Sequence, residues 1–116
     1  MSVTTGYIKP WGSYSITLES SKCKVKTVEV EPKHRLSYQY HTKRDENWVI
    51  IQGIAKVTID GKIEYLKAGN QTTIKRLQKH RVENVGKELL IFIEVQTGEY
   101  FGEDDIVRIE DDYDRV

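Results

Sequence analysis

Four side chains that can bind a metal ion lie in two short stretches of this sequence. Residues 36–41 read as a strand, which places Gln39 and His41 on one face because successive side chains of a strand point to opposite sides. Glu46 follows across a short polar turn, and His80 begins a second alternating run. If the two strands share one wall of a barrel, we expect the four side chains to converge.

The chemistry of these side chains indicates the kind of metal. Imidazole nitrogens, a carboxylate and an amide oxygen suit iron(II), manganese, cobalt, nickel or zinc better than a closed thiolate site would. Four protein ligands on a metal that prefers five or six leave positions open to a substrate. The alternative, from the residues alone, is that each histidine is satisfied by a hydrogen bond and that Gln39 faces water.

The elements that would position these residues are strands, because most of the sequence alternates with a period of two. Helices should be few. Asp60 and Gly61 predict a hairpin between two alternating runs, since both positions tolerate positive φ. Many short strands separated by turn residues indicate an all-β sandwich or barrel. The clearest alternating apolar positions are Tyr14, Ile16 and Leu18; Ala55, Val57 and Ile59; and Leu89, Ile91, Ile93 and Val95.

The segment 22–31 changes its phase. Cys23 and Val25 lie at odd positions but Val28 and Val30 at even ones, which predicts a β-bulge near Thr27. Cys23 is then an inward-facing small hydrophobe, with a thiol activated by flanking lysines as the alternative. As the single cysteine it cannot form an internal disulfide, and a reducing cytoplasm is the expected compartment.

Length and charge limit the domains and partners. The 116 residues suffice for a single domain, 1–116, with a motif-bearing core at about 22–96 and an acidic C-terminal segment at 99–116. Lysine plus arginine number 18 and aspartate plus glutamate 18, so no net charge attracts nucleic acid or a membrane, and a small ligand fits better. No secretion signal or membrane-spanning apolar run is present in the sequence, and a soluble protein is expected.

The order of the candidate ligands resembles the two cupin motifs, with glutamine at a first position that is normally histidine. Much of the chain, from about Lys9 to Arg115, is also similar to the type II mannose-6-phosphate isomerases. The resemblance implies an all-β cupin domain, a double-stranded β-helix or jelly-roll barrel, that binds one divalent metal through Gln39, His41, Glu46 and His80. The similar residues are Gln39, His41, Glu46 and Gly53 in the first motif, Gly69, His80 and Asn84 in the second, and the stretches 9–14, 36–41, 46–49, 93–98 and 102–108.

The resemblance also implies an activity. Such an enzyme interconverts mannose 6-phosphate and fructose 6-phosphate by moving a proton between C2 and C1 through a cis-enediol, with the metal as Lewis acid. In many of those proteins the cupin domain follows a mannose-1-phosphate guanylyltransferase. That part is absent from this sequence, so the resemblance implies a stand-alone isomerase domain without nucleotide chemistry. Apolar strand faces beyond those that the barrel needs for its own core suggest a homodimer, as is common among cupins.

Three further residues are candidates for the chemistry. Arg44 and Arg108 occupy arginine positions of the family pattern, and a guanidinium suits the oxygens of a phosphate. For Arg108, pairing with the acidic C-terminal segment is an equal alternative. Lys43 has the parity of Gln39 and His41 and is a candidate proton-transfer base, with solvation in a turn as the alternative.

Two departures from the family bear on these expectations. Where the family has three consecutive histidines and an arginine, this chain has His41-Thr42-Lys43-Arg44, so any role of the missing histidines would be lost or pass to Lys43. Lys75 and Leu77 replace a proline and a glycine in the turn before His80, so a different turn is expected. The alternative functions are a cupin dioxygenase, a non-catalytic sugar-phosphate sensor and isomerisation of another phosphosugar.

Overall fold

The computed structural model describes residues 5–115, and within them the chain forms strands and no helix, which confirms the all-β prediction. Residues 5–115 therefore contain no helix long and apolar enough to span a bilayer. The strands are β1 (Thr5–Lys9), β2 (Gly12–Glu19), β3 (Cys23–Val30), β4 (Tyr38–Tyr40), β5 (Arg44–Gln52), β6 (Ile54–Ile59), β7 (Lys62–Lys67), β8 (Gln71–Ile74), β9 (His80–Asn84), β10 (Leu90–Gly98) and β11 (Val107–Glu110).

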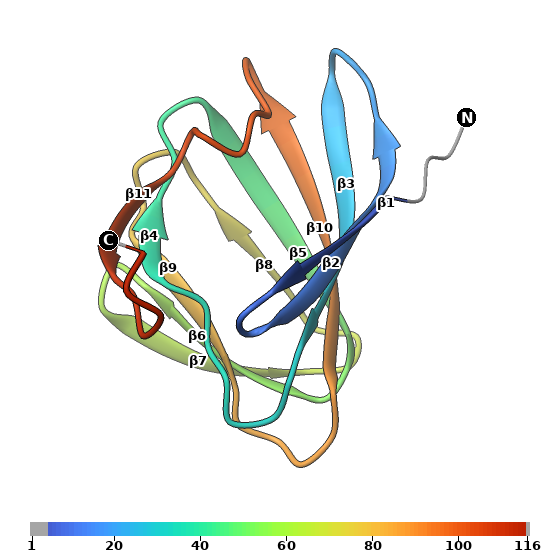
Figure 1. The fold of residues 1–116 in the computed structure, drawn as a ribbon, viewed down its shortest axis with the longest axis vertical. Helices are drawn as coiled ribbons and strands as arrows, with labels where there is room; N and C mark the ends of the chain where they lie inside the picture. Colours follow the sequence, from blue (N-terminus) through green and yellow to red (C-terminus); the bar gives the residue numbers. More distant parts are fainter. Residues whose placement is uncertain (1–4, 116) are drawn as a thin grey trace.

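Two antiparallel sheets face each other and enclose the core (Figure 1). The six-stranded sheet has the order β1-β2-β3-β10-β5-β8, and the five-stranded sheet has the order β11-β4-β9-β6-β7. The chain between β10 and β11 crosses from the first sheet to the second over one end of the molecule (Figure 1). Two strands far apart in sequence, β4 and β11, are thereby paired at the edge of the second sheet.

The hairpin predicted at Asp60 and Gly61 is confirmed. Ile59 pairs with Lys62 across the turn from β6 to β7, and the two residues between them have φ values of 48° and 82°. Positive φ at both central positions is the geometry that matches the right-handed twist of the flanking strands.

The interior changes from apolar to polar along the three central strands β3, β5 and β10. At one end the inward side chains form the hydrophobic core, and at the other end they are charged or amide groups. Register aligns these polar residues in rows, because Glu94 pairs with both Lys26 and Trp48, and Gln96 with both Lys24 and Glu46. The buried apolar residues of these strands are Val28 and Val30, Trp48 and Ile50, and Leu90 and Phe92.

The predicted bulge near Thr27 and the inward orientation of Cys23 are wrong. Strand β3 pairs with β10 without a register shift, and its buried positions are Lys24, Lys26, Val28 and Val30, in regular alternation. Cys23 lies on the opposite face and is partly exposed. The apparent change of phase arose because two inward positions of this strand carry lysines rather than apolar residues.

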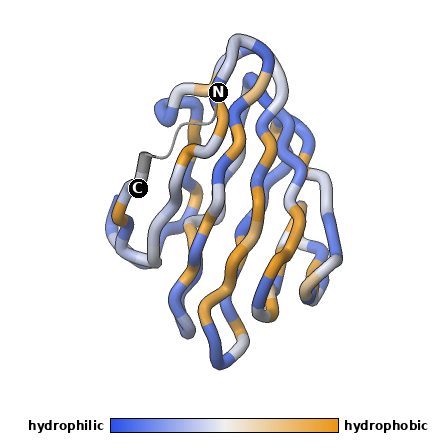
Figure 2. The backbone as a smooth tube through the Cα atoms, turned by 90° about the vertical axis from the view of Figure 1, so that its right-hand side faces the viewer, coloured by the Kyte–Doolittle hydropathy of each residue, from blue (hydrophilic) through white to orange (hydrophobic). Residues whose placement is uncertain are grey.

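The alternation of β10 was assigned to the wrong face. Leu90 and Phe92 point into the core and are fully buried, whereas Ile91, Ile93 and Val95 lie on the outer face and are partly buried. Figure 2, which views the side on which the six-stranded sheet lies, shows hydrophobic segments along its central strands. The homodimer expected from such an outer face stays a prediction.

Candidate metal centre

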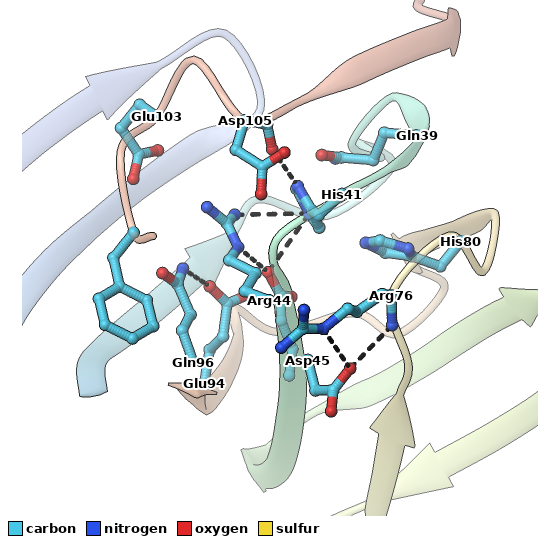
Figure 3. A network of polar contacts seen from close by, with 12 residues as sticks. Gln39, His41, Arg44, Asp45, Arg76, His80, Glu94, Gln96, Glu103 and Asp105 are labelled. Atoms are coloured by element: carbon cyan, nitrogen blue, oxygen red, sulfur yellow. Dashed lines mark hydrogen bonds and ion pairs between the residues drawn. The ribbon is translucent and has the colours of Figure 1, made fainter. Parts of the chain in front are cut away.

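A cavity of about 110 Å³ lies at the polar end of the space between the two sheets. All four predicted metal ligands line it: Gln39, His41, Glu46 and His80. Each of the four side chains is at least nine-tenths buried. Potential ligand atoms of His41, Glu46 and His80 lie within 4.8 Å of one another, so the structure brings this part of the predicted set together (Figure 3).

Strand pairing explains how residues so distant in sequence meet. Gln39 on β4 is directly opposite His80 on β9, and opposite Arg108 on β11. Directly opposed residues point to the same face of a sheet, so these three side chains share the inner face. Glu46 reaches the same point from β5 in the other sheet.

Both histidines use one ring nitrogen for a backbone carbonyl. Nδ1 of His41 lies 2.6 Å from the carbonyl oxygen of Asp105, and Nδ1 of His80 lies 2.9 Å from that of Gln78. A carbonyl can only accept, so Nδ1 carries the proton in both rings and the Nε2 lone pair is left for a ligand. Nε2 of His41 lies 3.3 Å from a carboxylate oxygen of Glu46.

Electrostatics keep these rings neutral. Burial lowers the pKa of both His41 and His80, and the positive charge of Arg44 lowers the pKa of His41 further. A neutral imidazole is the form that binds a metal, so the environment favours the ligand state at neutral pH.

Glu46 is held as a carboxylate by two donors. Nε of Arg44 donates to its Oε2 at 3.0 Å, and Nε1 of Trp48 donates to its Oε1 at 3.0 Å. Burial acts to raise the pKa of Glu46, but the charge of Arg44 and the hydrogen bonds outweigh it, so the pKa lies below its usual value. Trp48 therefore both fills the core and orients Glu46.

The donor set fits a divalent metal. Two neutral imidazoles, one buried carboxylate and the amide of Gln39 are the mixed nitrogen and oxygen ligands that borderline divalent ions accept. Nε2 of His80 is free within residues 5–115, and Nε2 of His41 accepts only a long hydrogen bond of 3.4 Å from Nη2 of Arg44. The amide nitrogen of Gln39 makes only a long contact of 3.5 Å, to the carbonyl of Ser37. That contact involves the amide nitrogen, so the amide oxygen of Gln39 is available as a ligand.

Sequence reasoning missed two polar residues of this site, Glu94 and Gln96. Both are buried on β10, and Nε2 of Gln96 donates to Glu94 at 2.6 Å. Burial, and then the neighbouring charge of Glu46, raise the pKa of Glu94 to about 7. Their parity with the buried Leu90 and Phe92 is the signal that could have identified them as inward residues.

The three candidates for catalysis have different positions. Arg44 is 5% exposed and lines the cavity. Lys43 is exposed, its ammonium lies 5.1 Å from the centre of the Tyr100 ring, and it is not among the residues that line the cavity. The structure thus brings Arg44 to the site and does not bring Lys43.

Arg108 lines the cavity, and within residues 5–115 it forms no ion pair with the carboxylates of the acidic C-terminal segment. Its buried Nε has no hydrogen-bond partner among residues 5–115. The carboxylates that could have paired with it are occupied elsewhere, Asp112 by Arg35, Glu110 by Arg81 and Asp111 by Arg115.

The turn before His80 keeps a conformation that favours glycine. Leu77 stands where the family has glycine, and its φ is 69°. Its backbone N–H donates to the carbonyl of His41 at 2.8 Å, so this turn is tied to the strand that carries a predicted ligand. The different turn expected from the loss of proline and glycine stays a prediction.

Comparison with known sequences identifies relatives over most of the chain. The family described as mannose-6-phosphate isomerase C-terminal matches residues 2–111. The alginate biosynthesis protein AlgA of Pseudomonas aeruginosa is 45% identical over 108 residues, and a mannose-1-phosphate guanylyltransferase of Escherichia coli K12 is 44% identical over 108 residues. Each alignment covers 93% of this chain but only 22% and 23% of those relatives, so the chain spans about a quarter of their length.

Solved structures support the fold. A conserved protein with a double-stranded β-helix domain from Klebsiella pneumoniae matches with a TM-score of 0.73 and 27% identity, over 83% of this chain and 77% of that one. Oxalate decarboxylase of Bacillus subtilis, a protein with Mn(II) centres, matches with a TM-score of 0.74 and 24% identity, over 87% of this chain and 29% of that one. The chain has the double-stranded β-helix fold of the cupins and belongs to the mannose-6-phosphate isomerase C-terminal family.

Proposed function

We propose that this protein is a metal-dependent aldose–ketose isomerase that interconverts mannose 6-phosphate and fructose 6-phosphate through a cis-enediol. The observation that carries the proposal is the buried cluster of His41, Glu46 and His80 beside a cavity that Arg108 also lines, with a buried Nε that has no hydrogen-bond partner among residues 5–115. Family membership supplies the reaction class, and this arrangement offers a place for both ends of the substrate.

Gln39, His41, Glu46 and His80 would hold one divalent ion, of zinc, cobalt, manganese, nickel or iron. When bound, such an ion acts as a Lewis acid toward the sugar's O1 and O2 and stabilises the negative charge of the enediolate. The protein supplies neutral imidazoles and an ionised carboxylate for this purpose, in a site largely shielded from water.

Arg108 and Arg44 would bind the phosphate. Burial and the nearby positive charge of Arg115 lower the pKa of Arg108, and the charges of Asp111 and Glu103 do not outweigh them, so protein carboxylates compensate its guanidinium only in part. A phosphate dianion would supply that compensation, and a planar guanidinium can donate to two of its oxygens. Arg44 is ion-paired with Glu46 and would act from beside the metal ligands.

The proton-transfer base predicted from the sequence is Lys43. Its side chain is exposed and lies beside Tyr100, a position that does not support this role. The substituted histidine run therefore keeps the non-catalytic sugar-phosphate sensor as a second candidate function.

A coupled assay for fructose 6-phosphate formation from mannose 6-phosphate tests the proposal. The samples are metal-loaded protein, chelator-treated protein, and the variants His80→Ala and His34→Ala. His34 is the matched control because it is a histidine that bonds to Tyr113 and does not line the cavity. We expect metal-dependent turnover in the wild type and His34→Ala, and none after chelation or in His80→Ala.

Two results would favour a different function from the proposed isomerase. Binding of metal and mannose 6-phosphate without turnover would favour the sensor. Oxygen consumption by the iron-loaded protein, with no isomerase activity, would favour a dioxygenase.

A further inference from the structure

The chain between β10 and β11 lies against the candidate metal centre from outside the barrel strands. Residues 99–106 leave the six-stranded sheet at Gly98 and enter the five-stranded sheet at Val107, passing over the end of the molecule where the cavity lies (Figure 1). We refer to residues 99–106 as the strap. Its contacts with the site are polar and come from its main chain as well as its side chains (Figure 3).

Asp105 makes the most direct of these contacts. Its carbonyl oxygen accepts the Nδ1 proton of His41 at 2.6 Å. One carboxylate oxygen accepts from the N–H and the hydroxyl of Thr42 at 3.0 and 2.8 Å, and the other accepts from the N–H of Lys43 at 3.0 Å. Asp105 is 8% exposed, so these bonds are largely shielded from water.

The opposite side of the strap is fastened to the six-stranded sheet. A carboxylate oxygen of Glu103 accepts from the ammonium groups of Lys24 and Lys26 at 3.1 and 2.8 Å. Lys24 also donates to the carbonyl of Phe101 at 3.0 Å, and Arg44 donates to the carbonyl of Gly102 at 3.3 Å. The two buried lysines of β3 thus have a structural partner, and the strap is held to the sheet at residues 101–103, shortly before Asp105.

We propose that Asp105 is a positioning residue for the metal centre. It acts through His41: its carbonyl sets the ring's tautomer and orientation, so that Nε2 faces the cavity, and its carboxylate holds the turn immediately after that histidine. The inference rests on the metal site of the proposed function. Groups that orient a ligand histidine in this way commonly change metal affinity 10–100-fold when removed.

The side chain matters even though the bond to His41 comes from the backbone. The three hydrogen bonds of the carboxylate join the strap to Thr42 and Lys43, which follow His41 directly. Removing the carboxylate leaves the carbonyl without this support and leaves the N–H groups of two turn residues without their acceptor. The ring of His41 can then rotate, and its Nε2 is no longer held in the position beside Glu46 and His80 that metal binding requires.

The test is a titration of chelator-treated protein with Co(II), followed by visible absorption and by calorimetry. The variants are Asp105→Ala, Asp105→Asn and Asp104→Ala. Asp104 is the matched control, since it is the adjacent exposed strap carboxylate and its bond is to Tyr100 rather than to the site. Asp105→Asn keeps an acceptor for Thr42 while removing the charge.

We expect Asp105→Ala to weaken Co(II) binding 10–100-fold and to alter the absorption spectrum of the bound ion. Asp104→Ala should stay within about twofold of the wild type, and Asp105→Asn should recover part of the lost affinity. Equal Co(II) affinity and spectra in Asp105→Ala and Asp104→Ala would overturn the inference. If Asp105→Ala does not fold, an Asp105→Asn variant that binds Co(II) with wild-type affinity and spectrum would overturn it. Wild-type protein that fails to bind Co(II) would overturn the metal site itself, whereas binding without isomerase turnover would refute only the proposed reaction.

Discussion

Glu46→Gln separates the two roles of the buried carboxylate, as counter-charge of Arg44 and as predicted metal ligand. The glutamine has the same shape and can still accept from Trp48, but it carries no charge. The guanidinium and carboxylate are 5% and 2% exposed and 3.0 Å apart, so removing one partner leaves a buried charge uncompensated. Such losses cost about 3–5 kcal/mol of the free energy of unfolding. We expect about 3 kcal/mol, because Arg44 retains its bond to the carbonyl of Gly102.

Urea and thermal unfolding in the presence of a chelator measure this cost. For a chain of this size, about 3 kcal/mol corresponds to a fall in melting temperature of roughly 10–15 °C. The control is Glu64→Gln, the same chemical change at an exposed position of β7, which should leave stability within about 0.5 kcal/mol of the wild type.

Unfolding with added Co(II) measures the second role. At 100 times its dissociation constant a bound metal stabilises a protein by about 2.7 kcal/mol, and Glu46→Gln should lose most of this gain. A chelated variant as stable as Glu64→Gln would refute the buried-charge reasoning. A full metal-induced stabilisation in Glu46→Gln would refute the ligand assignment.

Three further predictions concern residues around the site. Leu77→Gly should raise the free energy of unfolding by about 0.5–1 kcal/mol in urea unfolding, because it removes a left-handed leucine that is 63% exposed; a destabilised variant would contradict this. Partial burial acts to raise the pKa of Glu103, but Lys26 and Lys24 outweigh it and lower the pKa to about 2. The stability it contributes is present above the unfolded pKa of about 4.5 and is lost as pH falls toward 2, so Glu103→Gln should flatten the acid limb of a stability–pH curve, and an unchanged limb would argue against the contact. Arg108→Gln should raise KM for mannose 6-phosphate at least tenfold while Co(II) affinity stays unchanged; an unaltered KM would remove Arg108 from phosphate binding.

Local pattern was sufficient for much of the fold. A strand's period of two depends only on the backbone, so the parity of Gln39 and His41 correctly predicted a shared face. The Asp60 and Gly61 hairpin was equally predictable, because positive φ is a property of those residue types. The convergence of the ligands was predicted from the order of the motif together with a family resemblance, and in the structure potential ligand atoms of His41, Glu46 and His80 lie within 4.8 Å of one another.

Prediction from the alternation of apolar and polar residues failed where charged or amide side chains are buried. The buried lysines of β3 made that strand look irregular, although its inward positions alternate regularly and the register shift in its pairing with β2 lies on β2, between Ile16 and Leu18. Alternating isoleucine and valine on β10 concealed that Glu94 and Gln96 share the inner face with Leu90 and Phe92. A rule that expects apolar residues inside cannot identify such positions.

The sequence by itself determined the class of fold, the inward faces of strands such as β2 and β6 whose buried residues are apolar, and the order of the candidate ligands. The tertiary structure decided which charges could be buried, because each requires a partner supplied from elsewhere in the chain. Glu103 compensates Lys26 across 77 positions of sequence, and Asp105 orients His41 across 64. Burying a charge or a polar group is costly unless it is paired, and local sequence does not show where a distant partner will lie.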